Sequence, residues 1–280
     1  MATGLIKRTL AGLLMILIML GGMLSAYTFS LIVCFALSVI LHEYYAMSPL
    51  PSGYKAERFL SVFSVAASFL MLMSVLEFGL PAKYMLLLFI PYSAVLICLL
   101  FNPVEQTDAG HKTEYILFPI LYVGVPIMFL PFLMYNSQGE YTWRYFLMVF
   151  LLIWMSDIGA YLLGMAFGQK PGSKKLYPSV SPKKSWIGVW GGLLFTLAVA
   201  VFLHFTSFVE MSLLHYVAAA ILVVLFGTLG DLFESLIKRH YGVKDSGNIM
   251  PGHGGLMDRF DSALFVIPII VVYLKLLSII

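Results

Sequence analysis

The residues best suited to polar chemistry lie close together, between positions 231 and 261, in a chain of which only 11% is charged. This segment combines carboxylates, basic side chains and a run of glycines. These are the groups that hold a metal ion, neutralise phosphates and let the backbone approach a ligand closely. The combination indicates phosphoryl or nucleotidyl transfer at a membrane surface.

The first part of this segment is the expected end of an apolar helix. Asp231, Ser235 and Lys238 stand at i, i+4 and i+7, so a helix aligns them on one stripe, flanked by Glu234 and Arg239. The alternative is an ordinary amphipathic helix end, with Glu234 and Lys238 as a solvated ion pair. A role in function is favoured by Asp231, because a carboxylate in an apolar segment needs a cation or a hydrogen-bond network.

The second part is a glycine-rich turn followed by two carboxylates. The turn contains Gly252, His253, Gly254 and Gly255. Its glycines permit positive φ angles and the close backbone approach of a phosphate-cradling turn. Asp258 and Asp261 are three residues apart, which puts both carboxylates on one face of the first helical turn. The alternative is that Asp258 only caps the helix, because aspartate favours helix N-termini.

Two upstream positions are further candidates. Lys183 and Lys184 enter an expected helix N-terminus, where they oppose the macrodipole. Binding of a polyphosphate or lipid phosphate would explain them, and so would a positive-inside topology alone. Asp157 lies deep in an apolar run and is a functional candidate, with a structural Ser or Lys partner as the alternative. Gly159 and Gly164 beside it permit close helix contact.

The composition predicts an all-α, polytopic integral membrane protein. Hydrophobic residues make up 61% of the chain, more than a soluble domain can bury. Polar residues near the ends of the apolar runs, among them Glu43, are expected at the membrane interface. A spanning helix needs about 20 apolar residues. This length gives about nine spans, near residues 5–24, 26–45, 59–80, 83–101, 114–134, 143–167, 185–206, 213–238 and 260–280.

The beginning of the chain imitates a signal peptide, with basic residues ahead of an apolar stretch. The apolar run nevertheless continues to Leu41 and is broken only near Gly21 and Gly22. This pattern predicts a tight helical hairpin instead of a cleavage site.

The basic residues orient the spans, because cytoplasmic loops collect Lys and Arg. With the N-terminus in the cytoplasm, all 17 Lys and Arg residues except Lys83, Arg144 and Lys275 fall on the cytoplasmic side. The basic residues are scattered and the net charge is only +3, so no nucleic acid partner is expected. We expect one membrane domain over residues 1–280, with scaffold helices in 1–140 and catalytic helices and cytoplasmic loops in 141–280.

The segment from Ser235 to Asp261 resembles the signature of the phosphatidate cytidylyltransferases, also called CDP-diacylglycerol synthases. It matches as Ser-x-x-Lys-Arg from Ser235, as Lys-Asp from Lys244, and as Pro-x-His-Gly-Gly-x-x-Asp-Arg-x-Asp from Pro251. The pattern is long and specific. The first five spans resemble the family only in hydropathy.

The resemblance extends upstream of the signature. The segment Asp157-Ile-Gly-Ala-Tyr is similar to the family's Asp-x-Gly-Ala-Tyr, and Ser181-Pro-Lys-Lys-Ser to its Ser-Pro-x-Lys-Thr/Ser. Two departures are small, since Ser185 stands where Thr is common and Ser156 where Ala is common. Neither departure removes a carboxylate or a cation.

The resemblance implies CTP and phosphatidic acid as substrates, and CDP-diacylglycerol and pyrophosphate as products. Together with the distribution of Lys and Arg, these substrates lead us to expect an active site facing the cytoplasm from the cell (inner) membrane. The resemblance also implies a homodimer and Mg²⁺, with or without a second cation. Catalysis is assigned to Asp231, Lys238, Arg239, Asp258, Arg259 and Asp261. Among these, Asp231, Asp258 and Asp261 form the expected metal site, with Asp261 either a direct ligand or a support for the ligands. Substrate binding is assigned to Asp157, Ser181, Lys183, Lys184, Ser235, Lys244, Gly252, His253, Gly254 and Gly255.

Two other functions stay open. An ion-coupled transporter would use Asp157 and Asp231 as a relay and would spread its acids across the membrane thickness. A CTP-dependent enzyme acting on another lipid would share the phosphate-binding chemistry but form a different product.

Overall fold

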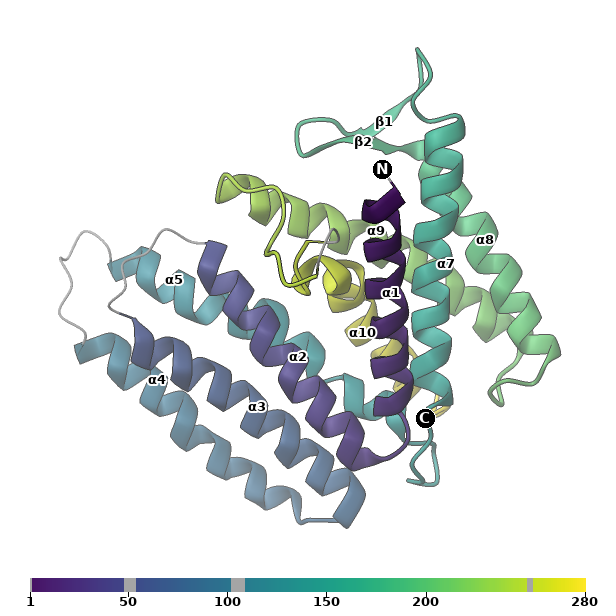
Figure 1. The fold of residues 1–280 in the computed structure, drawn as a ribbon. Helices are drawn as coiled ribbons and strands as arrows, with labels where there is room; N and C mark the ends of the chain where they lie inside the picture. The colour runs from purple at the N-terminus through teal and green to yellow at the C-terminus, as the bar shows by residue number, and fades with distance from the viewer. Residues whose placement is uncertain (1, 48–53, 102–108, 251–253) are drawn as a thin grey trace. The chain divides into compact units, whose positions relative to one another are not determined.

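The computed structural model describes residues 2–47, 54–101, 109–250 and 254–280, and helices make up most of them (Figure 1). The helices are α1 (Ala2–Gly22), α2 (Ala26–Met47), α3 (Lys55–Phe78), α4 (Phe89–Phe101), α5 (Ala109–Pro119), α6 (Val125–Ile127), α7 (Arg144–Ala166), α8 (Trp186–Phe205), α9 (Leu213–His240) and α10 (Met257–Leu276). Tighter 3-10 helices lie at Ala82–Leu88 and Leu130–Met134, and a short, wider π-helix lies at Ile120–Gly124. The predicted all-α membrane fold is confirmed.

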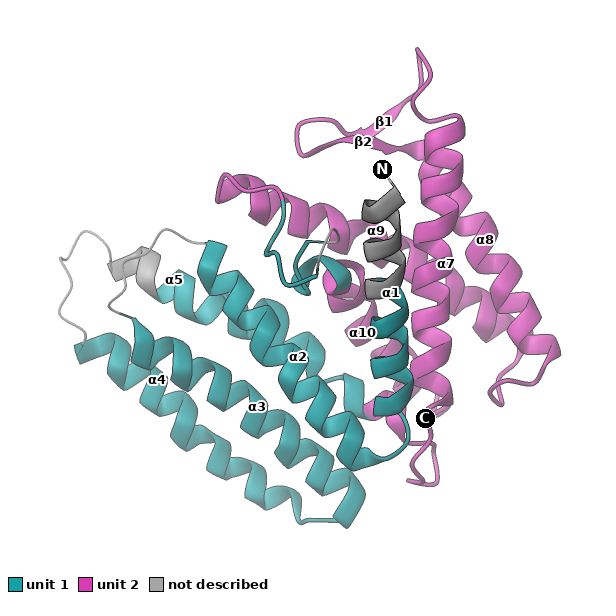
Figure 2. Ribbon diagram, viewed as in Figure 1, with its two compact units in different colours: residues 1–131, 245–259 teal, residues 132–244, 260–280 magenta. Residues whose placement is uncertain are grey.

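The chain forms two compact units (Figure 2). Unit 1 consists of residues 1–131 and 245–259, and unit 2 of residues 132–244 and 260–280. Helix α10 begins in unit 1 and continues in unit 2. The prediction of a single domain over 1–280, with its halves at 1–140 and 141–280, stays a prediction.

Within the described residues, seven helical stretches are long and apolar enough to cross a membrane. They are Ala26–Met47, Lys55–Phe78, Ala82–Phe101, Thr113–Met134, Arg144–Ala166, Trp186–Phe205 and Leu213–His240. Helix α1 adds a shorter apolar stretch, Gly12–Gly22, and α10 carries charged residues in its first turns. These helices confirm a polytopic membrane protein, while the count of nine spans and the cytoplasmic N-terminus stay predictions.

The first two helices form the predicted hairpin. Helix α1 ends at Gly22 and α2 begins at Ala26. The Ser25 hydroxyl accepts the Thr28 N–H at 3.2 Å, and the Thr28 hydroxyl accepts the Ser25 N–H at 3.1 Å. This reciprocal cap satisfies two backbone donors at the start of α2 and fixes the turn.

Helices α7 and α8 of unit 2 pack through glycines. A Cβ at Gly191 would lie 2.5 Å from the Gly159 carbonyl oxygen, and one at Gly192 would lie 3.0 Å from the Ser156 carbonyl oxygen. Backbone therefore meets backbone along this contact, which only small residues allow. The close helix contact predicted for Gly159 and Gly164 is confirmed, since Gly164 faces the Cα of Gly188.

A small β-hairpin joins α7 to α8 (Figure 1). Strands β1 (Lys175–Tyr177) and β2 (Ser181–Ser185) are antiparallel, with Lys175 opposite Ser185 and Tyr177 opposite Ser181. The hairpin gives a defined backbone to the lysine-rich connection, and so fixes where its side chains point.

Candidate active site

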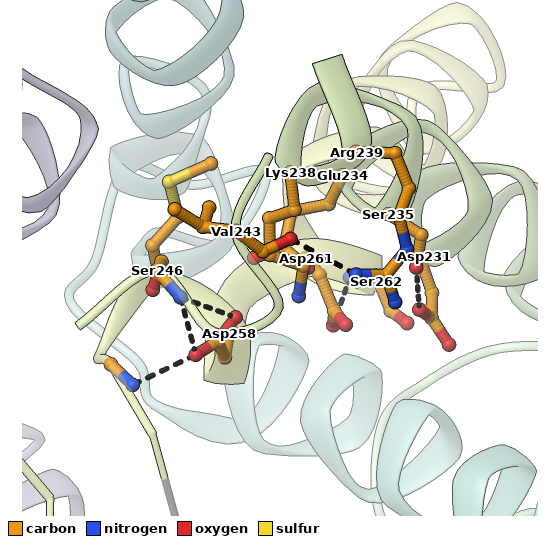
Figure 3. A network of polar contacts seen from close by, with 12 residues as sticks. Asp231, Glu234, Ser235, Lys238, Arg239, Val243, Ser246, Asp258, Asp261 and Ser262 are labelled. Atoms are coloured by element: carbon orange, nitrogen blue, oxygen red, sulfur yellow. Dashed lines mark hydrogen bonds and ion pairs between the residues drawn. The ribbon is translucent and has the colours of Figure 1, made fainter. Parts of the chain in front are cut away.

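Three carboxylates of unit 2 form an acidic cluster. Asp231 and Glu234 lie one turn apart on α9, and Asp261 lies on α10. One oxygen atom from each lies within 4.8 Å of the other two (Figure 3). Glu234 is fully buried, whereas Asp231 and Asp261 are half-buried. The structure thus brings together two predicted metal ligands, Asp231 and Asp261, and adds Glu234 to them.

A glycine on α9 permits this convergence. A Cβ at Gly230 would lie 2.6 Å from the carbonyl oxygen of Asp261 and 3.2 Å from the Cβ of Phe265. Because α9 comes this close to α10 at Gly230, the next residue, Asp231, also lies beside α10. The rings of Phe233 and Phe265, 5.3 Å apart, continue the same contact. The acidic cluster therefore depends on the absence of a side chain at position 230.

Two lysines accompany the acidic cluster. The Lys184 Nζ lies 2.5 Å from an Asp231 oxygen, and the Lys238 Nζ lies 2.5 Å from a Glu234 oxygen. Lys238 and Glu234 are both buried, so the pair is not the solvated helix end that the sequence left open as an alternative. Buried carboxylates are costly unless they are paired, and these lysines lower that cost.

The hairpin places Lys184. Adjacent residues of a strand point to opposite faces, so Lys184 reaches Asp231 while Lys183 is exposed. The Gln169 side chain donates to the Lys183 carbonyl at 2.8 Å, and Lys175 donates to the Gln169 side chain at 2.9 Å. At the end of β2, the Ser185 hydroxyl caps α8 by accepting the Gly188 N–H. Ser181, at the other end of β2, is half-buried.

Asp157 on α7 belongs to the electrostatic surroundings of the acidic cluster. Its charge acts on Asp261, as do the charges of Asp231 and Glu234. Three carboxylates of α7 and α9 thus act on Asp261 of α10 within unit 2. Asp157 therefore lies close enough to act electrostatically on Asp261. Its role in substrate binding stays a prediction.

The other predicted residues of the α9 end have local contacts. The Ser235 hydroxyl points to an Asp231 oxygen at 3.5 Å, and the exposed Arg239 side chain donates to the Val243 carbonyl at 2.9 Å. Arg239 therefore helps to close the end of α9. Lys244 and Arg259 are exposed. Phosphate binding by these cations stays a prediction.

In unit 1, Asp258 fastens the loop that precedes it. Its carboxylate accepts the Gly255 N–H at 2.8 Å and the Ser246 N–H at 3.1 and 3.2 Å (Figure 3). Gly254 has a φ of +83°, the left-handed conformation expected of a glycine turn. These contacts support the capping alternative for Asp258, and its role as a metal ligand stays a prediction. Gly252 and His253 lie outside the described residues.

Sequence reasoning missed two carboxylates. The signal for Glu234 was present, because it stands at i+3 from Asp231 on the same helix. The interfacial position expected for Glu43 stays a prediction, but the sequence did not show that Glu43 is only 3% exposed and binds the loop at Ser246, Leu256 and Met257. No pattern in the sequence links α2 to a loop some 200 residues later.

Several known proteins are similar in sequence to more than half of this chain. Phosphatidate cytidylyltransferases from Staphylococcus epidermidis and Staphylococcus aureus are 42% and 44% identical over 154 and 155 residues. Each alignment covers 55% of this chain and 56% of the relative, so the match spans a little over half the length of these curated proteins. A phosphatidate cytidylyltransferase from Bacillus subtilis is 37% identical over 186 residues, 66% of this chain and 67% of the relative.

A family model gives the broadest match. The model described as "Cytidylyltransferase family" matches residues 6–277. This range includes helices of both units, the β1–β2 hairpin with its lysines, and the glycine loop at residues 252–255. The chain belongs to the cytidylyltransferase family.

Proposed function

We propose that the protein transfers CMP from CTP to phosphatidic acid. A phosphate oxygen of phosphatidic acid attacks the α-phosphorus of CTP and forms the new P–O bond. The bond from the α-phosphorus to the bridging oxygen breaks, and pyrophosphate leaves with that electron pair. The products are CDP-diacylglycerol and pyrophosphate, and no covalent intermediate on the protein is needed.

The observation that carries this proposal is the acidic cluster with its two lysines, in a chain of the cytidylyltransferase family. Transfer of a nucleotidyl group needs positioning and charge neutralisation more than covalent help from side chains. The names of the relatives from Staphylococcus and Bacillus support phosphatidic acid as the acceptor.

The acidic cluster fits a hard divalent cation such as Mg²⁺. Its donors are all carboxylate oxygens, the ligands that Mg²⁺ prefers, and they converge within 4.8 Å. When bound, Mg²⁺ supplies positive charge beside the phosphates of CTP. Asp231, Glu234 and Asp261 would hold it, and Asp258, three residues before Asp261 on α10, stays a proposed ligand. A second cation would bind to the same group of carboxylates.

The basic residues would hold phosphates. Lys184 and Lys238 stand next to the carboxylates, so each can exchange its carboxylate partner for a phosphate oxygen. The exposed cations that would meet substrate first are Lys183, Arg239, Lys244 and Arg259. Asp157, Ser181, Ser235 and the turn Gly252, His253, Gly254 and Gly255 complete the proposed substrate-binding set.

The setting suits the two substrates. CTP is water-soluble and phosphatidic acid lies in a leaflet, so the site must open to water and to acyl chains. A multi-pass protein of the cell membrane with its site facing the cytoplasm meets both needs. We propose this location, together with the homodimer that the family resemblance implies.

The first test is pyrophosphate release by the purified protein in detergent micelles with CTP, phosphatidic acid and Mg²⁺. Each component is omitted in turn, and the lipid product is identified by mass. We expect release only with all three present, and CDP-diacylglycerol as the product. Formation of CDP instead would indicate a CTP-dependent kinase. Turnover with a different lipid phosphate would change the acceptor, and inactivity of folded protein would favour the transporter.

The metal site is tested by Asp231→Asn, Glu234→Gln and Asp261→Asn. Each substitution should raise the Mg²⁺ concentration needed for half-maximal activity. The expected increase is about 10- to 100-fold for a metal ligand or for a residue that orients a ligand. Binding of Mn²⁺, followed by electron paramagnetic resonance, gives a readout that does not need turnover. Glu210→Gln, an exposed carboxylate of unit 2, is the control. Unchanged Mn²⁺ binding in all three variants would remove the metal site.

A further inference from the structure

Glu43 is a buried carboxylate near the end of α2, far in sequence from the proposed site residues. It is 3% exposed, whereas its neighbour His42 is exposed. A carboxylate with so little access to water needs hydrogen-bond donors or a cation around it. The structure supplies donors from the loop that precedes α10.

Both oxygens of Glu43 bind this loop. Oε1 accepts the Leu256 N–H at 2.9 Å, and Oε2 accepts the Met257 N–H at 2.8 Å. Oε2 also accepts a bond from the Ser246 hydroxyl at 3.3 Å. Leu256 and Met257 lie at the start of α10, where backbone N–H groups have no partner inside the helix. Glu43 therefore acts as a helix cap supplied from another helix.

The fit around Glu43 is close. A Cβ at Gly255 would lie 2.6 Å from its Oε2, and a Cβ at Gly247 would lie 2.6 Å from its Oε1. The carboxylate thus occupies space that is available only because residues 247 and 255 are glycines. Longer side chains at either position would displace the loop or the carboxylate.

Asp258 holds the same loop from within. It accepts the N–H groups of Ser246 and Gly255, so Ser246 binds Asp258 through its backbone and Glu43 through its hydroxyl. Two carboxylates consequently fix the backbone at residues 246 and 255–257. Gly255 belongs to this fixed stretch, and Gly254 and Asp258 flank it. We propose all three for substrate or metal binding.

We propose that Glu43 is a positioning residue for the reaction, which sets the backbone of the glycine loop and the start of α10 so that Gly254, Gly255 and Asp258 can meet CTP. This role rests on the proposed function. The proposal gives α2, in the N-terminal half of the chain, an indirect role in the reaction. Glu43 positions the loop, and the loop residues contact the substrate.

The chemistry requires a carboxylate at this place. Glutamine has the same shape, but its NH₂ group would face a backbone N–H where Glu43 has an accepting oxygen. Two donors would then oppose each other in a buried setting, which is unfavourable. Aspartate keeps both acceptors but is one methylene shorter, so it can reach only part of the loop.

The test compares Glu43→Gln and Glu43→Asp with the wild type, per mole of folded protein. We expect kcat/KM for CTP to fall about tenfold or more in Glu43→Gln, with KM for phosphatidic acid unchanged, and a smaller loss in Glu43→Asp. Hydrogen exchange of the peptide that contains Leu256 and Met257 should accelerate in Glu43→Gln. The matched control is Glu57→Gln, since Glu57 is also a 3% exposed carboxylate of unit 1 and lies on α3.

The outcomes separate the proposals. Lower thermal stability with wild-type kinetics for CTP would make Glu43 merely structural and overturn the positioning role, as would unchanged hydrogen exchange. If Glu43→Gln does not fold, Ser246→Ala removes one bond and should raise KM for CTP more mildly. A wild type that forms no CDP-diacylglycerol would refute the proposed function, and the positioning role with it. Active wild type and normal Glu43 variants would refute the positioning role alone.

Discussion

Replacing Gly230 with alanine tests whether close helix packing assembles the acidic cluster. The new Cβ would lie 2.6 Å from the Asp261 carbonyl oxygen, whereas ordinary contact begins at 3.4 Å. Helices α9 and α10 must therefore separate by about 0.8 Å at this point, the difference between these two distances. The neighbouring Asp231 would move away from Asp261 by a similar amount.

Two energies decide the effect of Gly230→Ala on stability. Overpacking of this size costs about 1–3 kcal/mol. The higher helix propensity of alanine offsets about 1 kcal/mol of that cost. Activity should suffer more than stability, because a displacement near 1 Å at a reacting site can cost about 100-fold in rate.

Gly227→Ala is the matched control, one turn earlier on α9. Its Cβ would lie 3.6 Å from the nearest atoms, in Ser262 and Val266, which is ordinary contact. This variant should gain the helix propensity without the overpacking, so its unfolding temperature should equal or exceed that of the wild type.

The assay measures thermal unfolding in detergent and the Mg²⁺ dependence of pyrophosphate release for both variants. We expect Gly230→Ala to need more Mg²⁺ and to turn over at least tenfold more slowly, and Gly227→Ala to behave as the wild type. A folded Gly230→Ala protein with wild-type Mg²⁺ dependence would refute the argument that this glycine assembles the acidic cluster.

Further predictions concern the two lysines of the acidic cluster and the α7–α8 contact. Lys184→Gln should lower pyrophosphate release more than Lys183→Gln, because only Lys184 pairs with Asp231, while both change stability by less than about 1 kcal/mol in unfolding experiments. Lys238→Met should destabilise the protein by about 3–5 kcal/mol, since it leaves the buried Glu234 without this cation, and the double variant with Glu234→Met should recover part of that loss. Gly191→Ala should lower the unfolding temperature, as its Cβ would lie 2.5 Å from the Gly159 carbonyl oxygen, and a wild-type value would contradict the packing argument.

The apolar helices could be predicted from hydrophobic length alone. The expected spans 143–167 and 185–206 differ from α7 and α8 by one residue at each end. The β-hairpin between them could not be predicted, because β2 holds Ser181 and two lysines and shows no alternation of apolar residues. Its strands are short, and their positions depend on contacts with Gln169 and α8.

The candidate site was partly predictable. Asp231 and Asp261 stand out because acids in apolar helices require a partner, and the structure brings them together. Glu43 could not be found, because its partners are backbone N–H groups, which every residue of the loop carries. Side chains that bind one another can be suspected from their residue types. A side chain that binds backbone N–H groups requires no particular residue type in its partner, so the sequence does not indicate the contact.

On α9, an acid directly follows a glycine that packs against α10: Asp231 follows Gly230, which contacts Asp261 and Phe265. On α7, Asp157 lies two residues before Gly159, but Gly159 contacts α8, which has no acidic residue. A helix that packs through glycine comes closest to its neighbour at that turn, so a carboxylate beside the glycine is held near the neighbouring backbone. At Gly230, close packing and the convergence of Asp231 with Asp261 are therefore produced by the same turn of α9. Repulsion between these carboxylates opposes the approach that Gly230 permits, and the ion pairs of Lys184 and Lys238 reduce that repulsion.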